Sequence, residues 1–345
     1  MGPRPPRPTH ASIEKTMART VEPTSARGVR PGSAPAAEPA ARRRRPPTPY
    51  LLIIPALTLL SIVLLWPIVQ MVWYSLTGFT TRNLLPNQPG PSWNDFAHYR
   101  QLLTDPVFWT ILRNTVVVCV LMVGITMVLG TLVGLLLHKL PKWFSGFVAL
   151  GMMLAWATPA LSASLVFRWL FLPERGLVNV MLDRMPDWLV GGGWLEYNWF
   201  LEPGSLFSIL ITVIVWQSFP FVAVSVLAGL KSIPHELYEA ARMDGAGPWK
   251  AFWNVTFPML RPLFALLLVL QIIWDLRVFT QLYVLANSFQ NKDVYLLSYY
   301  IYQQGFSASP ANYGMGSAIA VVMTVMILAV TAYYLRIMIR QGETR

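Results

Sequence analysis

Six long apolar runs divide the chain, and polar or charged segments separate them. The runs cover residues 51–76, 111–137, 144–171, 205–230, 260–285 and 314–335. Each is long enough to cross a bilayer as a helix, which takes about 20 predominantly apolar residues. The pattern therefore predicts an all-α membrane protein with six transmembrane helices. Pro67, Pro159 and Pro220 predict kinks, which a bundle tolerates where neighbouring helices satisfy the freed carbonyl groups.

Composition supports a lipid environment. Hydrophobic residues make up 54% of the 345 residues and charged residues only 12%, whereas a soluble domain carries about 25% charged residues. Such a chain cannot cover itself with a polar surface. Its one cysteine, Cys119, lies within an apolar run, so no disulfide within the chain is possible.

Residues 1–49 differ from the rest of the chain. They are rich in Pro, Ala and Arg and contain almost no large apolar residues. Such a segment buries too little surface to offset its chain entropy, so it is predicted to be a disordered basic tail. Its run Arg42–Arg45 is interpreted as a cytoplasmic anchor beside the first span; a nucleic-acid patch and an export signal are the alternatives. Residues 50–345 then form one six-helix transmembrane domain.

The distribution of Lys and Arg predicts the orientation. If the N-terminus is cytoplasmic, 19 of the 27 Lys and Arg residues lie in cytoplasmic segments, seven lie in outer segments or at span ends, and Arg277 lies inside a span. The positive-inside rule then places both termini in the cytoplasm and the protein in the plasma membrane. The segment between the fourth and fifth spans is cytoplasmic in this orientation.

That segment, residues 232–258, is predicted to form a helix–turn–helix elbow. Ser232 can cap the first helix, and Pro234 is tolerated in its first turn. Gly245 and Gly247 permit the positive φ values that end a helix, and Pro248 suits the first turn of a second short helix. The elbow leads directly into the fifth span.

One face of the first elbow helix carries small side chains. Its helical spacing brings together Leu237, Ala240, Ala241 and Asp244. Two alanines on one face let another protein approach closely, so the elbow is interpreted as a docking element that transmits a displacement to a membrane helix. The alternative is an amphipathic hairpin that lies flat on the inner leaflet.

Polar residues enter the membrane in the fifth span. Helical spacing places Gln271, Trp274, Asp275 and Val278 on one face. A buried acid is costly in a bilayer, so it normally faces a partner or a watery cavity. One interpretation is a transport cavity in which Trp274 stacks on the solute and Asp275 accepts from hydroxyl groups. The other is an aspartate bonded to a neighbouring helix.

The spacing within the elbow resembles a family signature. Glu239-Ala-Ala, three residues, Gly245, nine residues and then Val-x-Phe-Pro258 is similar to the signature of ABC importer permeases, which ends in Ile-x-Leu-Pro. Val and Phe replace Ile and Leu here. The flanking stretches 232–234 and 244–248 resemble the first permease of maltose-type carbohydrate importers. The resemblance covers about residues 50–340 and is strongest over 205–285.

The resemblance implies a coupling role for the elbow. In that family the equivalent helix sits in a cleft of the ATP-hydrolysing subunit and carries its closure to the membrane helices. Glu239 would pair with a basic residue of the ATPase, Ala240 and Ala241 would allow close packing beside Asp244, and Gly245 would form the turn. ATP and magnesium would bind the partner ATPase, and no cofactor is expected on this chain.

The resemblance also implies partners and a cargo. A second homologous permease, a dimer of cytoplasmic ATP-binding subunits and an extracytoplasmic sugar-binding protein would complete the importer. The solute would be a sugar or oligosaccharide, with no nucleic acid involved. Ser218 and Phe221 match the sugar-contacting positions of span four in maltose-type permeases.

Two other classes of protein are weaker interpretations. A self-contained secondary transporter or channel normally needs several intramembrane carboxylates and an inverted repeat. Here Asp275 is the one acid well inside a predicted span, and no clear repeat is present. An enzyme is also not expected, because the chain has no phosphate-binding Gly-x-x-x-x-Gly-Lys motif, no catalytic grouping, and histidines without metal-ligand spacing.

Overall fold

The structure is a computed structural model that describes residue 2 and residues 48–286 and 292–342. Within those residues the fold is helical, and the β-structure is two isolated bridges, Thr77–Trp93 and Thr80–Asn312. The chain divides into two compact units, residues 1–56 and 57–345, and the second contains the helical bundle. The disordered tail predicted for residues 1–49 lies almost entirely outside the described residues and stays a prediction.

Five helical stretches in the described part of the chain are long and apolar enough to cross a membrane: Ile53–Ser75, Pro106–Lys139, Pro203–Ser232, Pro248–Leu276 and Tyr313–Arg336. A further pair, α5 (Lys142–Trp156) and α6 (Ala160–Leu170), passes the same test together but is bent by 92°. The prediction of an all-α membrane protein is confirmed, and the described residues contain six spans if the bent pair counts as the third.

The individual helices follow one another in a simple order. The first span comprises α1 (Thr48–Leu60), a π-helical turn (Ser61–Leu65) and α2 (Trp66–Ser75). The other long helices are α4 (Pro106–Lys139), α9 (Pro203–Ser232), α12 (Phe257–Leu276) and α15 (Tyr313–Gly342). Short helices connect them: α3 (Ala97–Thr104), α7 (Leu177–Asp183), α8 (Asp187–Val190), α10 (His235–Met243), α11 (Pro248–Ala251), α13 (Thr280–Ala286) and α14 (Leu297–Tyr302).

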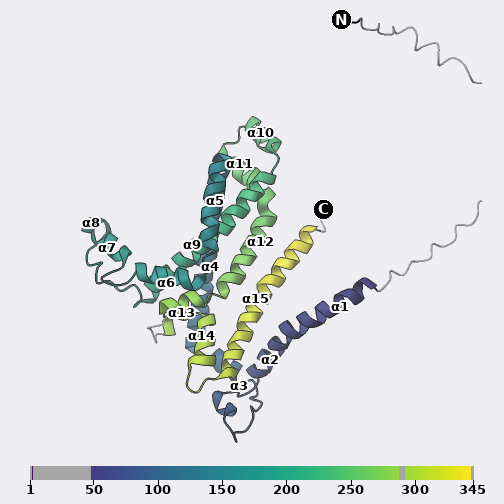
Figure 1. Ribbon diagram of the computed structural model, residues 1–345, viewed down its shortest axis with the longest axis vertical. Helices are drawn as coiled ribbons and strands as arrows, with labels where there is room; N and C mark the ends of the chain where they lie inside the picture. The colour runs from purple at the N-terminus through teal and green to yellow at the C-terminus, as the bar shows by residue number, and fades with distance from the viewer. Residues whose placement is uncertain (1, 3–47, 287–291, 343–345) are drawn as a thin grey trace, which may run out of the picture. The chain divides into compact units, whose positions relative to one another are not determined.

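The helices α4 and α9 pack against each other over much of their length and form the centre of the bundle (Figure 1). Two glycines of α4 make this close approach possible. A Cβ atom at Gly130 would lie 2.6 Å from Cβ of Val222, and one at Gly134 would lie 2.8 Å from the carbonyl oxygen of Ala223. Small residues four apart are a recurring means of bringing membrane helices together. The core therefore depends on backbone proximity as well as on large apolar side chains.

The third span breaks at the predicted proline. Pro159 has no amide hydrogen, and its ring disfavours helical conformation in the residue before it, so α5 ends at Trp156 and α6 begins at Ala160. The freed carbonyl of Thr158 accepts a hydrogen bond of 3.0 Å from Nε2 of Gln217 on α9. A neighbouring helix thus satisfies the break. In contrast, α9 continues through Pro220 as one helix.

The fifth span ends earlier than the sequence predicts. Its helix α12 stops at Leu276, not near residue 285, and a short bend leads into α13. The amide of Arg277 bonds to the carbonyl of Trp274, and that of Val278 bonds to the carbonyl of Asp275, so the last turn tightens. The predicted common helical face for Val278 is therefore wrong, because this residue lies beyond the helix end.

The end of α2 is fastened to α3 and α15. Nε2 of His98 lies 3.1 Å from the carbonyl oxygen of Thr77, and burial lowers the pKa of this imidazole from its ordinary value. A neutral His98 can still donate its Nε2 hydrogen to that carbonyl. Gly314, near the start of α15, sits so close that an added Cβ would lie 2.3 Å from the same oxygen. Glycine is required here by space.

The first span has no buried residue in its apolar window. Large side chains such as Leu59 and Ile62 are more than 60% exposed. This much apolar surface is not stable in water, so lipid or another protein covers it. The observation agrees with the composition of the chain.

Candidate functional site

The elbow of residues 232–258 lies at one end of the long helices, and α13 and α14 lie near the opposite end (Figure 1). It consists of α10, a turn, α11 and a π-helical turn (Phe252–Thr256) that continues into α12. The predicted helix–turn–helix elbow is therefore present. The segment from α11 through the π-helical turn into α12 is continuous, with no loop between the elbow and this membrane helix.

The turn after α10 has the geometry of a glycine-terminated helix. Gly245 has φ of +73°, which side chains rarely adopt. The amide of Ala246 bonds to the carbonyl of Ala241 at 2.9 Å, and that of Gly245 bonds to Arg242 at 3.0 Å. These two bonds form a Schellman motif, which satisfies carbonyls at the helix end. Gly247 has φ of −69°, so the predicted positive φ applies to Gly245 alone.

The predicted docking residues are open to the surface. No residue of α10 is buried in the isolated chain. Glu239, Ala240, Asp244 and Gly245 are exposed, and Ala241 is half-buried. Oε1 of Glu239 lies 3.1 Å from Nδ1 of His235, and both side chains remain more than 60% exposed. The carboxylate is thus held on the surface and remains accessible to a partner.

A hydrogen bond braces the elbow internally. The hydroxyl of Tyr238 on α10 lies 3.0 Å from Oγ1 of Thr256, which is buried at the start of α12. The bond spans the turn and connects α10 to the π-helical turn that leads into α12. Ser232 does not cap α10 as predicted: it is the last residue of α9, and its hydroxyl donates to the carbonyl of Gly229. Pro234 occupies the N-cap position instead.

A second site lies along the membrane helices. A cavity of about 190 Å³ is lined by Ser218, Trp274, Asp275 and Val278, all predicted from the sequence. Trp156, Ile214, Gln217 and Gln281 complete its wall. The lining comes from α5, α9, α12, α13 and the bend after α12. Val278 reaches the cavity although it is outside α12.

The carboxyl group of Asp275 is buried at the wall of this cavity. The residue is 4% exposed, and its Oδ2 has no hydrogen-bond partner among the described residues. Nearby, Gln281 donates to Oε1 of Gln217 at 3.3 Å. The cavity therefore combines a buried acceptor, two amide side chains and the indole of Trp274. Such a mixture suits a neutral solute rich in hydroxyl groups.

The other two predicted pathway residues lie beside the cavity and do not line it. Phe221 stacks on Trp156 with ring centroids 5.6 Å apart and contacts the edge of Trp274 at 5.4 Å. It thereby fixes the position of two cavity tryptophans. Gln271 is completely buried one turn before Asp275, and neither amide atom has a hydrogen-bond partner among the described residues. It does not line this cavity, and its predicted place in the solute pathway stays a prediction.

Four lining residues were not selected from the sequence: Trp156, Ile214, Gln217 and Gln281. Trp156 ends α5 just before the proline break, which brings it near α9. Gln217 could have been found as an amide inside an apolar run. Gln281 could not, because the predicted fifth span continued through it as a regular helix. The bend after α12 is what turns it toward the cavity.

A family model described as the binding-protein-dependent transport system inner membrane component matches residues 126–340. This match covers more than half of the chain. The chain belongs to this family. It is accordingly a permease subunit of an ABC importer, with several membrane-spanning helices. The alternative of a self-contained secondary transporter does not agree with this membership.

Similar proteins cover nearly the whole chain. The diacetylchitobiose uptake system permease protein of Streptomyces coelicolor is 36% identical over 88% of this chain and 90% of its own length. The trehalose/maltose transport system permease protein of Thermococcus litoralis is 30% identical over 84% and 92%. A bacterial alginate ABC transporter, crystallised with a periplasmic protein carrying an alginate pentasaccharide, has a TM-score of 0.67, covers 83% and 92%, and is 22% identical. This last likeness supports the fold.

Proposed function

We propose that this chain forms half of the pathway through which a sugar or oligosaccharide is imported, driven by ATP hydrolysis on a separate subunit. The observation that carries this proposal is the continuity of the exposed elbow with α12, which bears Trp274 and Asp275 at its other end. One helix thus joins a docking surface to a solute cavity. A shift of the elbow would move two of the residues that line the cavity.

The size of the cavity supports a shared pathway. Sites for small organic ligands commonly have volumes of about 300–1,000 Å³, and this one has about 190 Å³. A second homologous permease would complete the chamber from the opposite side. A dimer of ATP-binding subunits would hold ATP and magnesium, and an extracytoplasmic sugar-binding protein would deliver the solute. The carbohydrate-related names of the relatives favour a sugar as the cargo.

The elbow would contact the ATPase through the exposed carboxylate of Glu239 and the small side chains beside it. Glu239 would meet a basic side chain, Ala240 and Ala241 would permit close packing, and Asp244 would lie at the rim. Gly245 would hold the turn. None of these residues is needed to cover the core of the isolated chain, because all are exposed or half-buried.

The cavity residues predict separable effects on uptake and assembly. Asp275→Ala should lower sugar uptake about tenfold or more, because a buried acceptor bonded to the solute is lost. Trp274→Ala should lower it about two- to tenfold by removing a stacking surface. Uptake of radiolabelled sugars should be measured beside co-purification of the ATP-binding subunit, which both variants should retain.

Trp188→Ala is the matched control, since this tryptophan is 85% exposed and far along the chain from the cavity. It should transport at the native rate. Failure of assembly in Asp275→Ala would make the residue an anchor between helices. Native uptake in both cavity variants would place the pathway elsewhere.

The proposed orientation places both termini and the elbow in the cytoplasm. In a Cys119→Ser background, Trp188→Cys should react with an impermeant maleimide added to intact cells, and Met243→Cys should not. Both native side chains are more than 80% exposed, so accessibility is not limited by the fold. Met243→Cys should react once the membrane is permeabilised. The reverse pattern would invert the protein and remove the elbow from any cytoplasmic ATPase.

A further inference from the structure

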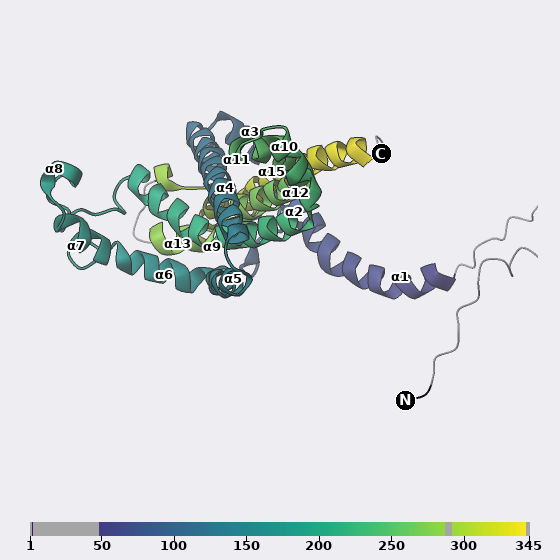
Figure 2. The ribbon, with the colours of Figure 1, turned by 90° about the horizontal axis from the view of Figure 1, so that it is seen from above.

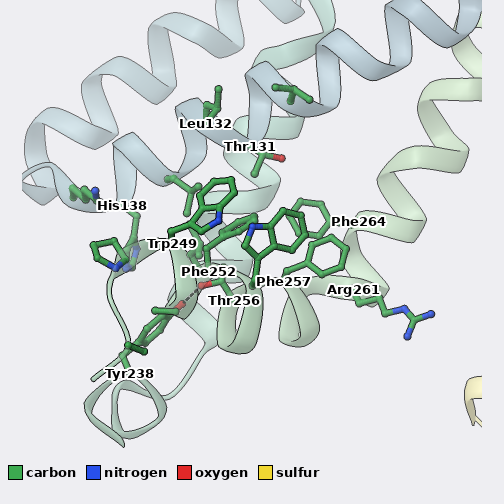
Figure 3. Close-up of a pocket in the computed structure, with 18 of the residues that line it drawn as sticks. Thr131, Leu132, His138, Tyr238, Trp249, Phe252, Thr256, Phe257, Arg261 and Phe264 are labelled. Atoms are coloured by element: carbon green, nitrogen blue, oxygen red, sulfur yellow. Dashed lines mark hydrogen bonds between the residues drawn. The ribbon is translucent and has the colours of Figure 1, made fainter. Parts of the chain in front are cut away.

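A second, larger hollow lies between the end of α4, the elbow and the start of α12. Its volume is about 1190 Å³. We name it the aromatic groove, after the rings that dominate its wall. The apolar part of that wall includes Leu132, Leu135, Trp249, Trp253, Phe257 and Phe264. Figure 3 shows the rings of Trp249, Phe252, Phe257 and Phe264 gathered into one group.

The aromatic groove has an apolar wall and cationic edges. Lys139, Arg242 and Arg261 contribute to its lining, together with His138 and His235. No Asp or Glu belongs to the lining that the described residues provide. His138 and Arg261 lie on opposite sides of the aromatic group (Figure 3). An occupant with apolar chains and a negatively charged group would match both features.

The position of the groove restricts the occupant further. It opens where α4 ends and α12 begins, at one end of two membrane spans. Trp249 and Trp253 are 75% and 46% exposed. Exposed tryptophans near the ends of membrane helices are typical of the membrane–water interface. Basic pockets between the ends of membrane helices bind anionic lipid head groups. Soluble anions would leave the apolar wall uncovered.

We propose that the aromatic groove binds one anionic glycerophospholipid. Its acyl chains lie along the rings of α11 and α12 and the leucines of α4, and its phosphodiester lies among the cations of the rim. This site is separate from the solute cavity, which shares no lining residue with it. It also differs from the docking surface, since Glu239, Ala240 and Ala241 do not line it.

Native mass spectrometry of the purified full-length chain, with its co-purifying subunits, tests the proposal. The sample is delipidated in detergent and offered equal amounts of phosphatidylglycerol and phosphatidylcholine with identical acyl chains. The amount of protein with one bound phosphatidylglycerol should exceed the amount with one bound phosphatidylcholine about fivefold or more. The double variant Lys139→Gln/Arg261→Gln should lose most of this preference. The control Arg175→Gln with Arg184→Gln removes two exposed charges outside the groove and should retain it.

A filling variant tests the apolar part independently of charge. Leu132→Trp should lower binding of both lipids by narrowing the groove, whereas the solute cavity is untouched. Equal binding of the two lipids, equal loss in the control variant, or displacement of the lipid by inorganic phosphate would overturn the proposal. So would lipid binding by the chain alone that disappears in the assembled complex, because another subunit would then cover the groove.

Discussion

Glu239→Lys is expected to abolish sugar uptake while leaving the protein inserted in the membrane. The carboxylate is exposed on α10, at the surface we propose to dock into the ATPase. A lysine there would bring like charges together in the interface, which costs several kcal/mol and predicts a loss of about a hundredfold or more. Uptake in cells and the amount of co-purified ATP-binding subunit should fall together.

The control for this variant is Glu196→Lys. Glu196 is also exposed, lies in the segment between α8 and α9, and undergoes the same change of charge. Its co-purification with the ATP-binding subunit should be unchanged. If Glu239→Lys retains both uptake and the subunit, the elbow is a surface hairpin and our assignment of the coupling role is wrong.

Gly245→Val is expected to lower uptake about five- to thirtyfold. The left-handed conformation costs a residue with a side chain roughly 1–2 kcal/mol, and β-branching adds to the strain. No atom lies within 4 Å of a Cβ placed at this position, so the loss comes from the backbone and not from a clash. The Schellman turn that orients α10 would be destabilised, and a smaller share of ATP hydrolysis would be coupled to transport.

Gly247→Val provides a matched comparison within the same turn. Its φ of −69° is ordinary for any residue, and its added Cβ also meets nothing within 4 Å. The same substitution two residues away should therefore transport at close to the native rate. Gly245→Asn should fall between the two, because asparagine tolerates the left-handed conformation better than valine. Equal rates in all three variants would contradict a role for the turn.

Sequence patterns predicted those parts of the structure that depend on local chemistry. Long apolar runs predicted the spans, Pro159 predicted the break in the third span, and the Gly-Ala-Gly-Pro stretch predicted the turn of the elbow. In each case the constraint acts within a few residues. The positive φ at Gly245 belongs to the same class.

Features that depend on packing between distant segments were not predictable in this way. The end of α12 at Leu276 is one example, since the apolar pattern continues to residue 285 without interruption. That early end moves Val278 off the helix and turns Gln281 toward the cavity. Gln271 has the helical spacing of a cavity residue, but it is completely buried and does not line the cavity. Helical spacing alone does not show which residues of one face border a cavity.

We propose that ATP hydrolysis on a partner subunit drives a sugar through the pathway that this chain helps to form. The most direct test is uptake of labelled disaccharides into proteoliposomes that contain the chain with its co-purified permease and ATP-binding subunits, with the sugar-binding protein added outside. Accumulation against a gradient is expected only when ATP is present on the side of the membrane where the elbow lies. Accumulation without ATP, driven by a proton or sodium gradient, would contradict this proposal.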